Sequence, residues 1–279
     1  MPGTADHPFT GPPVETIPLN PPPLARVLAQ VRFSPVLAVS DEAFAGQVQQ
    51  RLFDEYPVAR SDVEIGVMFA PGAEAPTPHQ TRLWRFQNTA ESWRVTLATG
   101  FVALETTDYD GHEDFFGRLE RVLDVIGELV RPPQVERTGV RYIQRLTDRE
   151  DLARVPEYVR PEVAGACAVH DEGAEITLCL TQTQAVMDDT HLTARWGILP
   201  PSAGVDPAIE PVDAPTWVMD IDVFDERRER FDADVLAQRA LEHSRRQYRF
   251  FRWAVEPAFL LRFGADEGLV EAASQEVVA

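Results

Sequence analysis

The sequence predicts an α+β protein with a mostly antiparallel, mixed β-sheet and about three main helices packed largely on one face. Segments of β-branched and aromatic residues with a two-residue periodicity recur along the chain, as expected for strands with one buried face. Three longer segments, near 41–56, 111–130 and 232–255, place apolar residues three and four apart and therefore predict amphipathic helices.

The centre of the chain carries the clearest pattern. Two strands, 93–97 and 101–107, flank a Thr-Gly turn. A helix is expected to begin near Asp110 and to end before Pro132, because proline cannot donate the next backbone hydrogen bond. A strand with alternating side chains follows at Val135–Leu146. The order strand, strand, helix, strand is typical of an α+β layer.

The remaining segments extend this architecture on both sides. Ser40 and Asp232 are expected to cap the first and last long helices. The polar, proline-punctuated stretch 148–165 is predicted to be an irregular connection. Further strands are predicted near 27–39, 63–70, 82–87, 175–183, 193–199 and 217–224.

The domain organisation follows from these elements. Residues 1–23 are dense in proline and are expected to form a flexible arm. Residues 24–264 are predicted to form a single α+β domain, or two fused halves with their boundary near 148–165. Residues 265–279 are expected to form an acidic tail.

Several motifs resemble those of a sporadically distributed family of uncharacterised bacterial proteins of similar length. They are Gln30–Phe33, Trp84–Phe86, Phe101–Tyr109, Asp114-Phe115 with Arg118-Leu119, Arg137–Ile143 and Asp220–Asp222. The resemblance covers roughly residues 20 to 265. It implies that the chain is one coherent unit, and it implies no activity.

Composition excludes several functions. The net charge of −19 disfavours nucleic acid and anionic membranes as partners, because the field of the protein repels phosphate; it is compatible with a basic protein partner. The chain contains no lysine, which excludes Schiff-base enzymes and a P-loop lysine. Its two cysteines form no CxxC motif, and no apolar run is long enough to span a bilayer, so a cytoplasmic protein is expected.

One polar constellation is a candidate site. By strand alternation, its arginines and acids are expected on one sheet face, opposite the apolar side chains. Two interpretations stay open: a network of structural ion pairs, or a pocket for an anionic or polar ligand. The candidate ligand-binding residues are Arg32, Arg141, Arg145, Glu105, Asp220, Asp222 and His243, with Arg94 and Arg195 as further cations.

Asp220, Asp222 and His243 each have a further interpretation. Asp220 and Asp222 lie two apart on one strand and are spaced to share a divalent cation or to work as an acid/base pair; otherwise no cofactor is expected. His243 lies on an apolar helix stripe, where a hydrogen-bonded core residue is the commoner outcome than a base or ligand.

These observations favour a non-enzymatic binding or regulatory accessory protein that acts through a protein partner. No GxSxG, HExxH or GxGxxG motif occurs. The alternative is a small-molecule or anion-binding protein, or an enzyme, that uses the sheet face lined by Arg and Asp. A homodimer is expected only from the general frequency of symmetric dimers.

Overall fold

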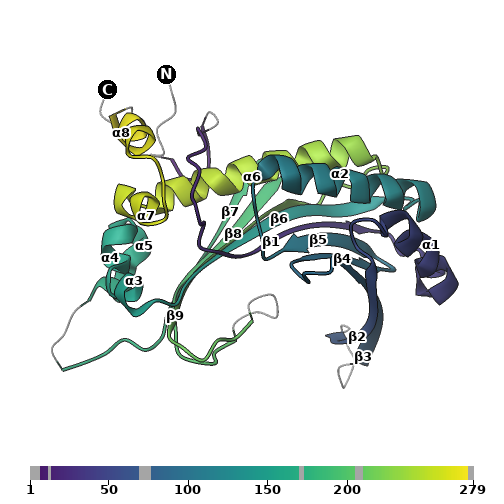
Figure 1. Cartoon of the computed structure of the whole chain (residues 1–279), viewed down its shortest axis with the longest axis horizontal. Coiled ribbons are helices and arrows are strands. Elements are labelled where there is room, and N and C mark those ends of the chain that lie inside the picture. Colours follow the sequence, from purple (N-terminus) through teal and green to yellow (C-terminus); the bar gives the residue numbers. More distant parts are fainter. Residues whose placement is uncertain (1–6, 12–13, 69–76, 170–172, 205–209, 276–279) are drawn as a thin grey trace. The chain divides into compact units, whose positions relative to one another are not determined.

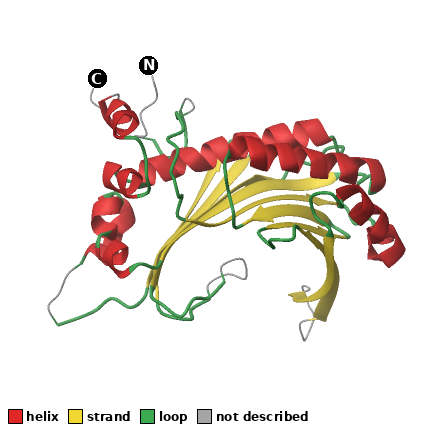
Figure 2. Ribbon diagram, in the orientation of Figure 1, coloured by secondary structure: helices red, strands yellow, loops and turns green. Residues whose placement is uncertain are grey.

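The computed structural model describes residues 7–11, 14–68, 77–169, 173–204 and 210–275. Its strands form one nine-stranded antiparallel sheet in the order β2-β3-β4-β5-β1-β6-β9-β8-β7, which confirms the predicted α+β class (Figures 1 and 2). The strands are β1 (Leu24–Phe33), β2 (Val58–Met68), β3 (Thr77–Gln87), β4 (Trp93–Ala98), β5 (Phe101–Thr106), β6 (Val135–Leu146), β7 (Cys179–Met187), β8 (Thr190–Leu199) and β9 (Thr216–Asp225).

The prediction of about three main helices is wrong, because the described residues form eight α-helices. The three expected ones are α1 (Glu42–Leu52), α2 (His112–Leu129) and α6 (Ala233–Ala254). The others are α3 (Arg149–Ala153), α4 (Val155–Tyr158), α5 (Pro161–Ala164), α7 (Pro257–Arg262) and α8 (Glu267–Gln275), together with the 3-10 helices η1 (Leu37–Ser40) and η2 (Gly165–Ala168).

Proline explains most of the missed helices. The stretch 148–165, expected to be an irregular connection, holds α3, α4 and α5, and proline occupies the first turn of both α4 and α5. Proline also opens α7. A missing N–H does no harm in the first turn of a helix, so proline there starts a helix instead of breaking one.

The caps show how local chemistry sets the helix starts. Asp232 accepts a hydrogen bond from the backbone N–H of Val235, which confirms the predicted cap of α6. The cap of α1 is Asp41, one residue after the predicted Ser40. At α2 the cap residue is Gly111, and no side chain caps it, so the predicted role of Asp110 is wrong.

The chain divides into two compact units, and each is described separately. The first unit comprises Met1–Val27, Val140–Asp225 and Glu242–Ala279. The second comprises Leu28–Gly139 and Glu226–Leu241. Strands β1 and β6 and helix α6 contribute residues to both units.

In the first unit, β7, β8 and β9 pair in antiparallel register, and one face of β9 forms the core. Trp217, Met219, Ile221 and Val223 are buried on that face, where the hydrophobic cluster also includes Phe250 of α6. The part of the chain before β1 also takes part, since Ile17 is buried and its N–H donates to the Tyr248 hydroxyl at 2.8 Å.

A glycine fixes the β7–β8 pairing in this unit. Gly197 has φ of +146°, and a Cβ atom there would lie 1.8 Å from the carbonyl oxygen of Cys179. Only glycine allows the two backbones to approach this closely.

In the second unit, β2, β3, β4 and β5 form a meander with antiparallel pairs. Helix α2 buries an apolar stripe that includes Phe115, Leu119, Leu123 and Ile126, as the sequence predicts. Helix α1 packs against α2.

Candidate functional site

Asp220 is the centre of the charged sheet face in the first unit. Its side chain on β9 is 2% exposed and contacts two guanidinium groups. Arg141 of β6 donates from Nε to Oδ1 at 2.6 Å and from Nη2 to Oδ2 at 2.7 Å. Arg195 of β8, which is paired with Asp220 in the strand register, donates to Oδ2 from Nη2 at 2.7 Å and from Nε at 3.1 Å. The structure therefore brings two of the predicted arginines and one predicted acid together on this face.

This geometry favours the ion-pair interpretation of the constellation. Both carboxylate oxygens of Asp220 already accept charge-assisted hydrogen bonds, which are the strong class of such bonds. A metal ion shared with Asp222 would have to displace a guanidinium group. Asp222 itself is half-buried and lies opposite Thr193 of β8. A ligand role for Asp220 and Asp222 stays a prediction that the geometry does not favour.

Arg145 makes a different contact from that of Arg141. Its Nη1 donates to the backbone carbonyl of Glu210 at 2.9 Å, and the Glu210 carboxylate pairs with Arg26 at 3.0 Å. Arg145 also lines a cavity of about 460 Å³ together with Pro22 and Asp213. Its partner is therefore a loop and not the Asp220 carboxylate.

Two predicted residues belong to the second unit. Glu105 of β5 is paired in register with Arg94 of β4, and their side chains form an ion pair. Arg32 of β1 is exposed. Glu105 thus takes part in a cross-strand ion pair, the arrangement expected of a structural network.

His243 is a buried partner of a carboxylate. It is 3% exposed on α6, and its Nε2 lies 2.9 Å from Oδ2 of the buried Asp225 at the end of β9. One residue on, the Ser244 hydroxyl lies 2.9 Å from the hydroxyl of Tyr142 on β6. These contacts fasten α6 to the sheet of the first unit, as expected of a hydrogen-bonded core histidine.

A second ionic cluster lies in the second unit. Glu55 accepts from Arg121 Nε at 2.8 Å and from Arg118 Nη1 at 2.9 Å. The hydrogen bond from Arg121 lowers the pKa of Glu55 despite its partial burial. Burial raises the pKa of the neighbouring Tyr56 to about 12.

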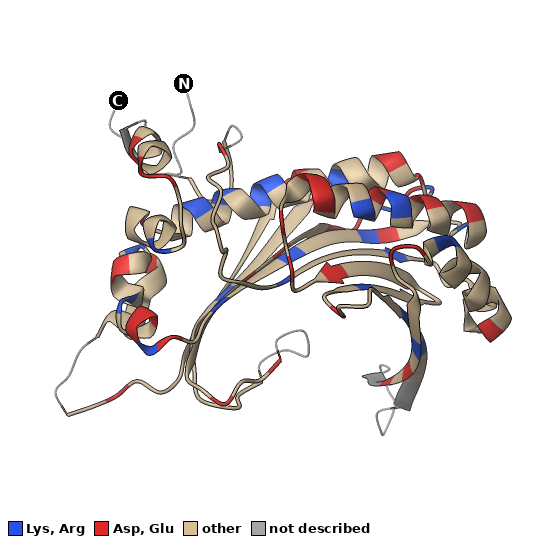
Figure 3. Cartoon of the chain, viewed as in Figure 1, with Lys and Arg blue, Asp and Glu red and all other residues tan. Residues whose placement is uncertain are grey.

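An arginine cluster on α6 was not predicted from the sequence. Basic residues follow one another along this helix at positions 245, 246, 249 and 252 (Figure 3). Arg249 is 4% exposed, and among the described residues neither of its Nη atoms has a hydrogen-bond partner. The Nε of Arg252 is likewise buried without a partner among them. Burial lowers the pKa of both arginines. The available signal was their spacing of three and four residues, which places them on the same stripe as Tyr248.

Arg249 and Arg246 line a cavity of about 600 Å³ in the first unit. Its other described walls are Phe9, Thr10 and Gly11 before β1, and Ala185, Val186, Met187 and Asp188 at the end of β7. It combines a cationic wall with an apolar one, which is typical of sites for small molecules.

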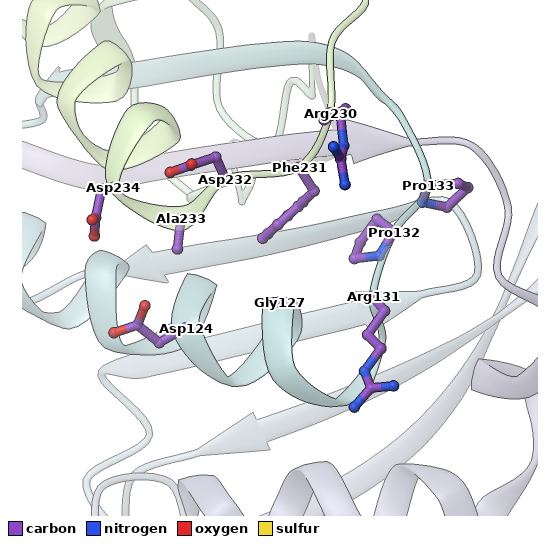
Figure 4. A pocket seen from close by; sticks show the side chains of 10 residues that line it. All are labelled: Asp124, Gly127, Arg131, Pro132, Pro133, Arg230, Phe231, Asp232, Ala233 and Asp234. Carbon is purple, nitrogen blue, oxygen red and sulfur yellow. The ribbon is translucent and has the colours of Figure 1, made fainter.

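A further cavity, of about 510 Å³, lies in the second unit where α2 ends and α6 begins. Its walls carry both charges, from Asp124, Asp234, Arg131 and Arg230. Figure 4 shows the guanidinium groups of Arg131 and Arg230 well apart, with Pro132 between them in this view. The lining therefore presents no convergent set of polar groups.

Strand β7 is the last strand of the sheet order and the edge of the first unit. Its nine residues, Cys-Leu-Thr-Gln-Thr-Gln-Ala-Val-Met, include no charge and no proline. Leu180 and Val186 are 43% and 67% exposed. Edges of this composition are open to pairing with another strand.

No protein-family model matches the chain, and a search of curated proteins gave no significant match. Membership of the bacterial family therefore stays a prediction. In the described part of the chain, no three metal-ligating side chains gather into a group. No helix among the described residues combines the length and the hydropathy needed to cross a bilayer.

Proposed function

We propose that this protein is a non-enzymatic binding protein that holds a protein partner by adding an extended strand of that partner to β7. The observation that carries the proposal is the uncharged edge of the sheet at β7. In strand addition, backbone hydrogen bonds supply the affinity and alternate side chains supply the specificity.

The contrast between the two ends of the strand order supports this proposal. The other end strand, β2, carries Arg60, Asp62 and Glu64. Charged side chains on an edge strand are a common protection against unwanted pairing. Strand β7 has no such protection, which favours an edge that is kept open for a partner.

The side chains of β7 indicate the chemistry of the partner strand. Leu180 and Val186 lie on the same face of β7, because they are six residues apart, with two glutamines between them on that face. An incoming strand is expected to place apolar or β-branched residues beside Leu180 and Val186. The net charge of −19 favours a partner that is basic outside this strand, since opposite charges accelerate association.

The alternative function, catalysis or ligand binding on the Arg/Asp sheet face, has less support. The Asp220 carboxylate would be its acid, base or metal ligand, yet both oxygens are held by guanidinium groups. A general base needs a free position beside the proton that it accepts.

A library of displayed nine-residue peptides, selected against the wild-type protein, tests the proposal. Leu180→Lys places a charge on the edge, and Leu261→Lys on α7 is the matched control, because Leu261 is also 43% exposed. We expect selected peptides that bind the wild type and the control equally but bind Leu180→Lys at least tenfold more weakly. Hydrogen exchange should then show new protection within β7.

Two results would overturn the proposal. The first is a set of selected peptides that bind Leu180→Lys as tightly as the wild type, or a library that yields no binder. The second is a wild-type protein whose mass in solution is twice that of the 31.2 kDa chain, together with a Leu180→Lys variant that is a monomer. This result would assign the edge to a second copy of this chain.

A further inference from the structure

The guanidinium of Arg249 is a buried cation, and no acid among the described residues pairs with it. Nη1 and Nη2 have no hydrogen-bond partner among the described residues, although the side chain is 4% exposed. Buried charges in proteins are normally paired, and buried donors are normally satisfied. The contrast with Arg141, which donates two bonds to Asp220, shows what a satisfied arginine looks like in the same unit.

The described residues Phe9–Gly11, before β1, cover this guanidinium and carry no charged side chain. Gly11 has φ of +130°, and a Cβ atom there would lie 2.9 Å from Nη1 of Arg249. The backbone therefore crosses directly over the guanidinium, and glycine is the residue that permits the approach. Nearby, the ring of Phe9 packs against Phe250 with centroids 6.0 Å apart, which holds the cover in place.

The surroundings add a second cation to the cavity wall. Arg246 precedes Arg249 by three residues on α6 and lines the same cavity. Asp188 is the one acid among the described lining residues; it is exposed at the turn after β7, and no hydrogen bond links it to Arg246 or Arg249. The balance of charge inside the cavity is therefore positive, although the chain as a whole is acidic.

We propose that this cavity is a binding site for a small organic anion that carries a carboxylate or phosphate group on an apolar body. The anion would accept hydrogen bonds from Nη1 and Nη2 of Arg249, whose planar fork matches both groups, and would be close to Arg246. The apolar body would contact Phe9, Val186 and Met187. The volume of about 600 Å³ lies within the range of small-molecule sites.

The cavity and the proposed strand-addition surface share Val186 of β7. The two proposals are tested at different residues, because Leu180, which is changed in the test of strand addition, does not line the cavity. The two experiments can therefore fail independently.

The experiment measures the binding of four probes by calorimetry. The probes are phenyl phosphate, hexanoate, inorganic phosphate and chloride, and the buffer contains only weakly coordinating ions. The variants are Arg249→Met and Arg246→Gln, with Arg245→Gln as the matched control, because Arg245 is an exposed arginine on the same helix. Phenyl phosphate and hexanoate distinguish a phosphate site from a carboxylate site, and inorganic phosphate shows whether the apolar body contributes.

We expect phenyl phosphate or hexanoate to bind the wild type and Arg245→Gln equally and more tightly than inorganic phosphate or chloride. Arg246→Gln should weaken binding at least tenfold, and Arg249→Met should abolish it. Without any probe, Arg249→Met should be at least as stable as the wild type, because it removes an uncompensated buried charge.

That stability measurement keeps the proposal falsifiable if no probe binds tightly. The proposal is overturned if none of the four probes binds the wild type, or if they bind Arg249→Met equally well. It is also overturned if Arg249→Met unfolds more readily than the wild type in probe-free buffer, which would make Arg249 a structural residue.

Discussion

Replacing Asp220 with asparagine keeps the shape of the side chain and removes the negative charge between Arg141 and Arg195. This carboxylate accepts four hydrogen bonds from the two guanidinium groups. Removing one partner of a buried pair costs about 3–5 kcal/mol, because the remaining charge is left without compensation. Arg141 and Arg195 are 14% and 22% exposed, so water will partly solvate them. We therefore expect the lower end, about 3 kcal/mol.

Urea unfolding followed by far-ultraviolet circular dichroism measures this loss, and thermal unfolding should show a fall of roughly 6 °C or more. Asp222→Asn is the matched control, since Asp222 lies two residues along the same strand on the same face but is only half-buried. It should cost less than about 1 kcal/mol. Moderate salt should leave the difference between the two variants largely unchanged, because a buried pair is poorly screened. Equal stability of Asp220→Asn and the wild type would refute the ion-pair interpretation.

Three further predictions concern single groups. Burial raises the pKa of Tyr56 to about 12, so the folded protein resists ionisation of this side chain. The resulting stability is present below pH ~10 and is lost as the pH rises from ~10 to 12. Tyr56→Phe should reduce this loss of stability in unfolding experiments at a series of pH values. Burial and the neighbouring Cys179 raise the pKa of Cys167 to about 11, so about one thiol in a thousand is ionised at pH 8. Iodoacetamide should therefore label Cys167 slowly until urea is added, as followed by mass spectrometry. Fast labelling of the native protein would contradict this. Gly197→Ala should destabilise the first unit by more than about 3 kcal/mol, because its Cβ would overlap the Cys179 carbonyl, whereas Gly46→Ala on α1, where nothing lies within 4 Å of the new Cβ, should be neutral or stabilising.

The sequence predicted strands and long helices because their burial follows a simple period. Strand β6 was predicted with the bounds that it has, and the stripe of α2 is buried as expected. The short helices were missed because each spans four to nine residues, too few for a three- and four-residue pattern to show. The prolines of 148–165 predict an irregular connection, but they begin helices there because they stand in the first turn.

The candidate site shows a similar limit. Alternation along β6 and β9 predicted that Arg141 and Asp220 share a face, and they do. The position of Glu105 beside Arg94 depends on which strands are neighbours and in which register, and alternation within a single strand does not determine register. Arg249 could not be recognised because its burial depends on Phe9–Gly11, which is remote in sequence and carries no periodic signal.

Arg141 and Arg249 show that arginines with little exposure can have opposite roles. Arg141 lies beside a carboxylate that it shares with Arg195, so Arg141→Met leaves the buried Asp220 with half of its hydrogen bonds and should cost about 2 kcal/mol or more. Arg249 has no such acid among the described residues, so the same substitution relieves a buried charge and should cost nothing in the absence of an anion. Both variants remove a guanidinium group from the first unit. Urea unfolding of both variants therefore distinguishes an arginine that stabilises the fold from one that binds a ligand. Equal losses of stability would show that both arginines are structural, and the search for function would then concentrate on the edge of β7.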